Sequence, residues 1–301
     1  MSAIKVIPKF VTLPNGVQLY TERVALTEPA DSSETHTIVL IHGMGGSTSI
    51  FYPIYASLLS SFPSSTLLAY DQAGHGLSPI DPSKVHGGAN PLAIDDIRSD
   101  LDALITQEAP TGRLSVIAHS AGTLITSYFL ISSSPNVARI SHAVFIGGPL
   151  SMPAPPEVTT MQLAFCSKVE KEGTSAIAED VTPALVGKTS MQSRPVAVAL
   201  VRSLLLGQPK DGYAAAIRAH SAFMKLGPFP FEKFPDALEV LFVGGEEDLF
   251  VSPDAMNTLS EKVRNSQVIT LPAVGHTPQV EVPSEFVDVV AKFLKERIHS
   301  N

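Results

Sequence analysis

The sequence predicts an α/β fold, with a mostly parallel central β-sheet flanked by helices. Continuous apolar segments rich in β-branched residues recur along the chain, and segments with helical spacing of apolar residues lie between them. Uninterrupted apolar strands are typical of a parallel sheet buried on both faces. Their alternation with helices indicates right-handed βαβ units. A length of 301 residues suits one large domain or a core domain with an insertion.

The first expected element is a β-hairpin. In "FVTLPNGVQLY", the Asn15-Gly16 pair predicts a tight turn between two strands. The strands that follow share a continuous apolar run, and they are expected at 36–43, 65–71, 113–119, 142–148, 238–245 and 267–272.

Helices are expected between these strands. Apolar residues at helical spacing predict one over 91–108, and Ser120 opens another that carries Leu124, Ile125, Tyr128 and Phe129 on one face. Ser252-Pro253 forms a good start for a helix over 253–264. A stripe from Phe286 to Ile298 predicts a last helix after Pro283.

Residues 150–230 contain no convincing strand, so they predict a helical cap inserted between core segments 1–149 and 231–301. Helices are expected near 157–170, 195–206 and 211–225. Apolar side chains of this segment pack adaptably and are candidates for lining a substrate cavity, although core packing is the commoner role. These candidates are Met152, Met161, Phe165, Met191 and Met224.

Composition argues against several classes of partner. The net charge of −8 argues against nucleic acid and anionic membranes. Cys166 is the only cysteine, which excludes an intramolecular disulfide, and no Cys/His cluster indicates a metal. The N-terminus lacks the apolar stretch of a signal peptide, and no uncharged run of about 18 residues suggests a membrane span. A cytoplasmic protein is therefore expected, of undetermined oligomeric state.

The segment "VIAHSAGTLI" (116–125) places Ser120 between an apolar strand and a helix. Serine is a common helix N-cap, which is one reading of this position. The carboxyl end of a parallel strand is also where α/β proteins place their active sites. Ala118 and Gly122 are small enough for the sharp strand-to-helix turn that exposes a nucleophile, in a relaxed form of the pattern G-x-S-x-G.

A nucleophilic serine needs a base and an acid that orients the base. Asp248 follows the strand predicted at 238–245, and His276 follows the next strand. The order Ser, Asp, His along the chain fits a triad at one sheet edge. The neighbouring Glu246 and Glu247 are less suited, because the G-x-x-D spacing from Gly245 favours Asp248.

The glycine-rich segment "HGMGGS" (42–47) offers backbone N–H groups to a developing oxyanion. The candidate donors are the amides of Met44 and Ala121. Other polar residues of the motif loops are expected to shape the loops, and these are His42, Asp71, His75 and His119. His119, next to Ser120, is also a candidate for lining the substrate pocket, whereas Glu281 is expected to face solvent or tie down a loop.

Five motifs, "HGMGGS", "DQAGHGLS", "AHSAG", "GGEEDLFVSP" and "GHTPQVEVP", span residues 42–283 in the order found in one superfamily. The chain resembles the α/β-hydrolase superfamily, in particular its capped serine esterases and lactonases. The resemblance implies the α/β-hydrolase fold, a helical cap and no cofactor. Together with the expected triad it predicts a serine hydrolase that cleaves a small-molecule ester or lactone through an acyl-enzyme, and the Met, Phe and Leu side chains of the cap favour a small, largely apolar substrate. Ala118, where glycine is usual, is the departure from the pattern.

Two alternatives stay open at this point. The same triad serves C–C bond hydrolysis and acyl transfer to an alcohol, so the fold alone does not choose the reaction. A ligand receptor that has kept the hydrolase fold and the triad is the other alternative.

Overall fold

The computed structural model describes residues 3–28, 35–80, 92–148, 155–226 and 228–295. These residues form an eight-stranded sheet in the order β1-β2-β4-β3-β5-β6-β7-β8. The first two strands pair antiparallel and β2 pairs antiparallel with β4, whereas all other neighbours are parallel. The strands are β1 (Ile4–Thr12), β2 (Gln18–Leu26), β3 (His36–Ile41), β4 (Ser65–Tyr70), β5 (Arg113–His119), β6 (Ile140–Ile146), β7 (Glu239–Gly245) and β8 (Ser266–Leu271). The mostly parallel sheet predicted from the sequence is confirmed.

The predicted hairpin is confirmed at β1 and β2. Its turn is closed by backbone hydrogen bonds from Gly16 N to Leu13 O and from Leu13 N to Val17 O. Each predicted apolar run contains a strand. Residues of β3 and β7 are buried throughout, whereas the edge strand β8 is buried only in part because one of its sides has no neighbouring strand.

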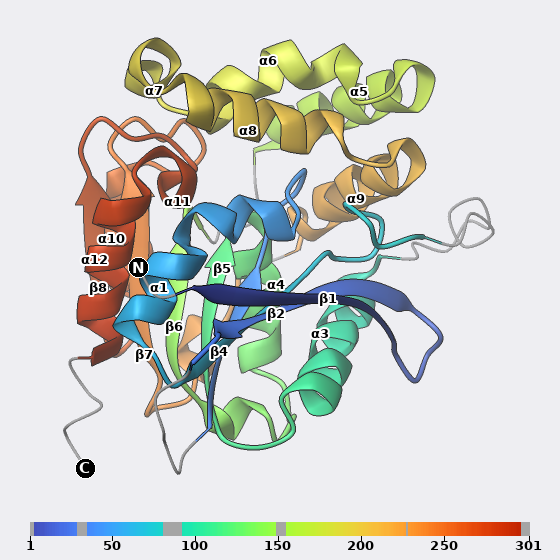
Figure 1. The fold of residues 1–301 in the computed structure, drawn as a ribbon. Helices are drawn as coiled ribbons and strands as arrows, with labels where there is room; N and C mark the ends of the chain where they lie inside the picture. Colours follow the sequence, from blue (N-terminus) through green and yellow to red (C-terminus); the bar gives the residue numbers. More distant parts are fainter. Residues whose placement is uncertain (1–2, 29–34, 81–91, 149–154, 227, 296–301) are drawn as a thin grey trace.

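Helices cover both faces of the sheet (Figure 1). On one face, side chains of α1 (Tyr55–Ser61) and α12 (Pro283–Lys295) share a core cluster with the sheet. On the other face, α3 (Ile94–Glu108), α4 (Ala121–Leu130) and α10 (Pro253–Ser260) form a second cluster with it. Short helical segments complete the described core, and they are η1 (Thr48–Ile54), η2 (Val137–Arg139), η3 (Phe231–Lys233) and α11 (Pro278–Glu281).

Two predicted helices are longer than the observed ones. The helix expected over 91–108 begins at Ile94, and the helix expected over 253–264 ends at Ser260. After Ser260 the chain tightens, because the N–H groups of Lys262 and Val263 bond carbonyls only three residues back. Ile298, predicted to end the last helix, lies outside the described residues.

The segment predicted as a cap is helical and lies over the carboxyl ends of the parallel strands (Figure 1). Its helices are α5 (Pro156–Glu172), α6 (Ser175–Leu185), α7 (Lys188–Ser193), α8 (Pro195–Leu206) and α9 (Lys210–Phe223). The sequence did not predict α6 and α7. Pro183 inside α6 and Gly187 just before α7 interrupt the helical pattern there.

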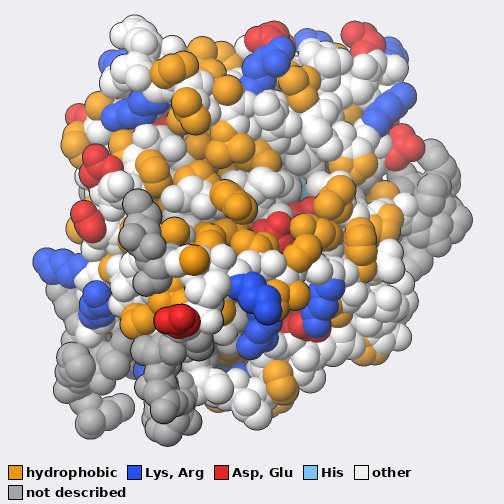
Figure 2. All heavy atoms as spheres, viewed as in Figure 1, with side chains coloured by type: hydrophobic (Ala, Val, Ile, Leu, Met, Phe, Trp, Pro, Cys, Tyr) orange, Lys and Arg blue, Asp and Glu red, His pale blue; other side chains and the backbone are white. Residues whose placement is uncertain are grey.

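Hydrophobic side chains are scattered, with charged ones among them, over the face that the cap and core share (Figure 2). Val196 on α8 is a large apolar side chain that is mostly exposed. Scattered exposed apolar residues are ordinary on a protein surface. Within the described residues, no helix has the length and hydrophobicity that crossing a membrane requires.

Candidate active site

Ser120 occupies a strained turn between β5 and α4. Its backbone has φ 52° and ψ −122°, in a region that non-glycine residues rarely adopt. The Ser120 N–H donates to the carbonyl of Ile146 at 2.8 Å, which fastens the turn to β6. The side chain makes no capping hydrogen bond to α4. The simple N-cap reading of this serine is therefore wrong, and its hydroxyl is available for another partner.

The turn is possible because small residues surround it. A Cβ at Gly122 would lie 2.6 Å from the carbonyl oxygens of Ile41 and His42, so only glycine fits there. Ala118, by contrast, lies in β5 and is fully buried in the core cluster that also contains Ile41 and Phe145. Its methyl group packs into the sheet core, which explains why alanine is accommodated where glycine is usual.

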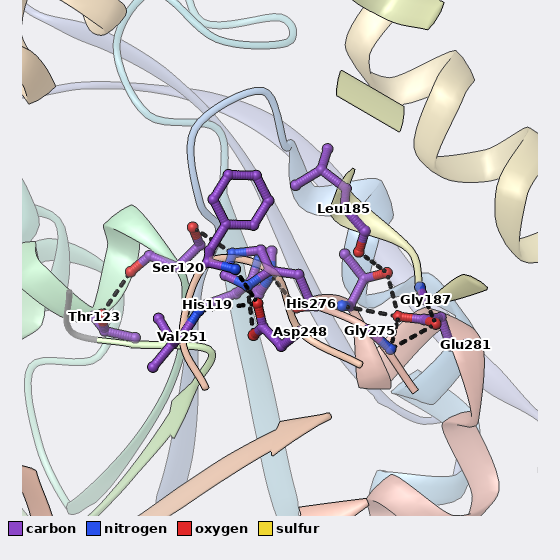
Figure 3. Close-up of polar contacts among 12 residues, drawn as sticks. His119, Ser120, Thr123, Leu185, Gly187, Asp248, Val251, Gly275, His276 and Glu281 are labelled. Atoms are coloured by element: carbon purple, nitrogen blue, oxygen red, sulfur yellow. Dashed lines mark hydrogen bonds and ion pairs between the residues drawn. The ribbon is translucent and has the colours of Figure 1, made fainter. Parts of the chain in front are cut away.

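Ser120, His276 and Asp248 form a continuous hydrogen-bonded chain (Figure 3). The Ser120 hydroxyl lies 2.9 Å from His276 Nε2, and His276 Nδ1 lies 2.8 Å from Asp248 Oδ2. A carboxylate can only accept, so Nδ1 carries the hydrogen and Nε2 accepts from the serine. This tautomer leaves Nε2 ready to take the serine proton.

Asp248 is held as a carboxylate in a buried place. Burial alone raises the pKa of this carboxyl group, but the adjacent His276 ring and the backbone N–H groups of Phe250 and Val251 outweigh it, and the pKa lies below its usual value. The two amides donate to Oδ1 at 2.8 and 3.1 Å, which leaves Oδ2 for His276. Asp248 therefore stays ionised and keeps a fixed orientation beside the imidazole.

The His276 ring is enclosed by groups that fix its position. Its backbone N–H donates to the carbonyl of Leu185 in the cap, and its carbonyl accepts from His119 Nε2 at 2.9 Å. Gly147, at φ 56°, passes so close that a Cβ there would lie 2.7 Å from the ring. The sequence ends a strand near Gly147 but gave no sign that this glycine makes room for the imidazole.

His119 lies beneath the loop that carries His276. Its ring is buried, and burial followed by the neighbouring His276 lowers its pKa to about 3. A neutral His119 that donates to the carbonyl of His276 supports the backbone of that loop. The predicted pocket-lining role of His119 stays a prediction.

Glu281, on α11, binds the loop of His276 to the cap. Its carboxylate accepts hydrogen bonds from the backbone N–H groups of Gly275, Thr277 and Gly187. It also accepts from the hydroxyl of Ser190 on α7. Glu281 is buried, so of the two roles expected from the sequence the loop-tying one is confirmed.

The glycine-rich loop after β3 lies against the nucleophile turn. A Cβ at Gly43 would lie 2.6 Å from Cβ of Ser120, so the two backbones touch at this point. From the cap, Gln208 donates through Nε2 to the carbonyls of Gly45 and Gly46, each at 3.1 Å. Its Oε1 accepts from the backbone N–H of Gly76 at 3.1 Å. Gln208 thus joins two core loops to the cap, a role that no local pattern indicated.

Asp71 and His42 shape these loops, as the sequence predicts. Asp71 accepts from the backbone N–H groups of Thr48 and Leu77 at 2.7 and 2.8 Å. Its burial raises the pKa of its carboxyl group, an effect that these two hydrogen bonds oppose. His42 Nε2 accepts from the backbone N–H of Gln72, and burial lowers the pKa of His42 to about 4.

The predicted cap residues differ in their surroundings, and their role in lining a substrate cavity stays a prediction. Met161 and Met191 are 47% and 42% exposed, and Phe165 packs against the cluster inside the cap. Met224 is buried. Met152 lies outside the described residues.

Cys166 is a buried cap residue whose thiol donates to the carbonyl of Ala214. Among the described residues, no group of three or more His, Cys, Asp or Glu side chains is placed to hold a metal ion.

Comparison with known proteins places this geometry in a family. A search of the curated proteins gave no match. Among solved structures, the chain is similar to a thermophilic esterase from Thermogutta terrifontis, with 20% identity, 96% of this chain and 98% of that chain covered, and a TM-score of 0.79. It is similar to an enol-lactonase from Burkholderia xenovorans, with 21% identity, 96% and 100% covered, and a TM-score of 0.77. It is also similar to a bromoperoxidase from Bacillus anthracis, with 19% identity, 96% and 100% covered, and a TM-score of 0.77.

At these identities the solved structures establish the fold, and the family comes from the sequence. The family model described as "Alpha/beta hydrolase family" matches residues 38–289, which include all three residues of the hydrogen-bonded chain. The chain therefore belongs to the alpha/beta hydrolase family.

Proposed function

We propose that this protein is a serine hydrolase that cleaves a small carboxylic ester or lactone through an acyl-enzyme. The observation that carries this function is the chain from Ser120 through His276 to Asp248, with Ser120 on a strained turn. Membership of the alpha/beta hydrolase family supports a hydrolase. The likeness to an esterase and an enol-lactonase is consistent with ester chemistry.

In the first half-reaction, Ser120 Oγ attacks the substrate carbonyl while its proton passes to His276 Nε2. Asp248 stabilises the imidazolium that forms. The backbone N–H groups of Met44 and Ala121 are the proposed donors to the oxyanion, and one such donor is typically worth about 10²–10³ in rate. His276 then protonates the leaving oxygen, and the C–O bond to the leaving group breaks.

In the second half-reaction, His276 takes a proton from water, which attacks the acyl carbon. The tetrahedral intermediate collapses, Ser120 Oγ regains its proton, and the carboxylic acid leaves. No cofactor enters either step.

The test combines turnover with covalent labelling. The wild-type protein is expected to hydrolyse short p-nitrophenyl esters and to react with a fluorophosphonate at Ser120. Ser120→Ala should abolish both. The control is Ser127→Ala, which removes a buried serine hydroxyl of α4 that donates to the Thr123 carbonyl; it should keep both activities. Absence of hydrolysis and labelling in the folded wild-type protein would contradict the proposed function.

A further inference from the structure

A small cavity lies beside the two proposed oxyanion donors. It has a volume of about 30 Å³, and its lining includes both Met44 and Ala121. Ala121 directly follows the nucleophile in the chain. The cavity therefore adjoins the place at which the proposed mechanism puts the substrate carbonyl.

The walls of the cavity are mostly apolar and include no acidic side chain, lysine or arginine. Ile125 of α4 and Ala219 and Phe223 of α9 are among its lining residues. Two histidines also line it, and both are buried. Burial and the neighbouring His42 lower the pKa of His75 to about 3, and burial lowers the pKa of His220 to about 4. Both imidazoles are neutral near pH 7, so the cavity presents no charge to a ligand.

The position of the leaving group decides which part of the substrate the cavity can receive. His276 must protonate the leaving oxygen, so the leaving group lies on the side of His276. Among the described residues, the cavity lining comes from the loops after β3 and β4, from α4 and from α9 with nearby apolar side chains. It includes no residue of the loops that carry Asp248 and His276. The cavity therefore lies on the acyl side of the scissile bond.

We infer that this cavity is the acyl-binding subsite and that its size restricts the enzyme to esters of short, uncharged acyl chains. One water-sized group needs roughly 10–15 Å³ of such space, so the cavity holds about two groups beyond the carbonyl carbon. This subsite rests on the proposed serine hydrolase function. In a small lactone the acyl chain turns back to the leaving oxygen, so the subsite favours open-chain esters over small lactones.

The experiment measures kcat/KM for p-nitrophenyl acetate, butyrate, hexanoate and octanoate. For the wild-type protein we expect a fall of at least about tenfold from acetate to hexanoate, since a misfit of one methylene in a pocket already costs about tenfold or more. Phe223→Ala enlarges the cavity and should raise the hexanoate-to-acetate ratio by about tenfold. Ala219→Val narrows it and should lower the butyrate-to-acetate ratio. Phe223→Leu gives a smaller enlargement with less risk to folding.

The controls lie on the other face of the same helix. Ile217 and Ala214 belong to the buried cluster inside the cap, against which Met44 also packs, and neither of them lines the cavity. Ile217→Ala and Ala214→Val match the two substitutions in kind and should leave the chain-length ratios at the wild-type values. Circular dichroism of every variant confirms that it is folded.

Two outcomes overturn the subsite while leaving the hydrolase intact. In one, the cavity variants keep the wild-type chain-length ratios although Ser120-dependent hydrolysis persists. In the other, they change the preference among ethyl, phenyl and p-nitrophenyl acetates instead, which would place the leaving group in the cavity. A wild-type protein that shows no Ser120-dependent hydrolysis is a different result, because it contradicts the proposed serine hydrolase function itself.

Discussion

At the scale of single residues, the site depends on backbone positions that ordinary side chains avoid. Ser120 has a positive φ, and so does Gly147, which faces the imidazole of His276. Glycine adopts a positive φ without strain, whereas at Ser120 this conformation costs of order 1–3 kcal/mol and persists only where the surroundings enforce it. The conformation of Ser120 directs its hydroxyl at Nε2 of His276, so the fold loses some stability while the hydroxyl gains a fixed orientation.

Replacing Ser120 by glycine is expected to stabilise the fold while removing the hydroxyl. Glycine tolerates this backbone conformation, so Ser120→Gly should raise the free energy of unfolding by about 1 kcal/mol. Ser120→Ala keeps a Cβ and therefore keeps the strain. Denaturant unfolding of the two variants makes the comparison, and equal stabilities would contradict a strained turn.

Gly147→Ala should damage catalysis more than stability. The new Cβ would lie 2.7 Å from the ring of His276 and push the imidazole away from Ser120. Misplacement by about 1 Å is enough for a loss of about 10²-fold in kcat. Gly173→Ala is the matched control, because Gly173 also has a positive φ (83°) but no atom near its would-be Cβ. Gly173→Ala should lose stability through its backbone conformation alone and keep its activity, whereas Gly147→Ala should lose activity.

The lowered pKa of Asp248 gives stability a defined dependence on pH. A carboxyl group whose pKa is lower in the folded state contributes stability above its unfolded pKa of about 3.9, and this contribution disappears as the pH falls through the folded value. The stability difference between wild-type protein and Asp248→Asn should therefore be largest near pH 7 and shrink below about pH 4. Urea unfolding across this range measures it, and a constant difference would refute the assignment. At pH 7 the variant should lose about 10⁴ in kcat because the tautomer is wrong.

At the scale of elements, the sequence predicted what local patterns encode. Continuous apolar runs predicted the strands of the sheet, and the order Ser120, Asp248, His276 predicted the residues that form the hydrogen-bonded chain. Helices α6 and α7 were not predicted, because Pro183 and Gly187 interrupt the helical pattern of the sequence. The packing of these helices within the folded protein overrides that local signal. The contacts of Gln208 with Gly76 and Gly45 could not be predicted from a local pattern, because these partners lie 132 and 163 residues away along the chain.

Gln208→Ala should slow the chemical step by releasing the glycine-rich loop. The side chain holds the carbonyls of Gly45 and Gly46, and these fix the turn that presents the Met44 amide. We expect kcat to fall about tenfold with KM little changed, as for an interaction that acts mainly in the transition state. Gln208→Glu keeps the acceptor for Gly76 but loses the donors, so it should not rescue kcat.

The control for Gln208 is Arg202→Ala. Arg202 forms an exposed ion pair with Glu179 within the cap, and exposed pairs contribute little. This variant should match the wild-type protein in kcat and in the rate of fluorophosphonate labelling. A Gln208→Ala variant that raises KM alone would show that the side chain serves substrate binding and not the oxyanion loop.

At the scale of the whole molecule, α7 is fastened to the loops that carry the acid and the base. Glu281 accepts from Gly187 and Ser190, and Glu247 accepts from both the backbone and the hydroxyl of Thr189. Arg194, just after α7, donates to the carbonyl of Ala273. The cap is thus hydrogen-bonded to the edge of the core that carries the site. The side chains that make these bonds are not members of the Ser120-His276-Asp248 chain.

Glu281→Ala should loosen the cap and the His276 loop together. Several buried donors would lose their acceptor, and each unsatisfied group costs about 1–3 kcal/mol. Amide hydrogen exchange should accelerate in 185–194 and 273–277 in parallel, with a loss of kcat. Glu261→Ala, an exposed residue just after α10, is the control and should leave both segments protected. Faster exchange in only one of the segments would contradict a shared anchor.

The fastening of α7 also sets a rule for recombining this enzyme with its relatives. An exchange of the cap alone would separate α7 from the core residues that receive its hydrogen bonds. The interchangeable unit is discontinuous: the cap together with Glu247, Ala273 and Glu281. A chimaera with crossover points only at the two ends of the cap would lose these hydrogen bonds. A chimaera that also transfers the residues at the three core positions would keep them.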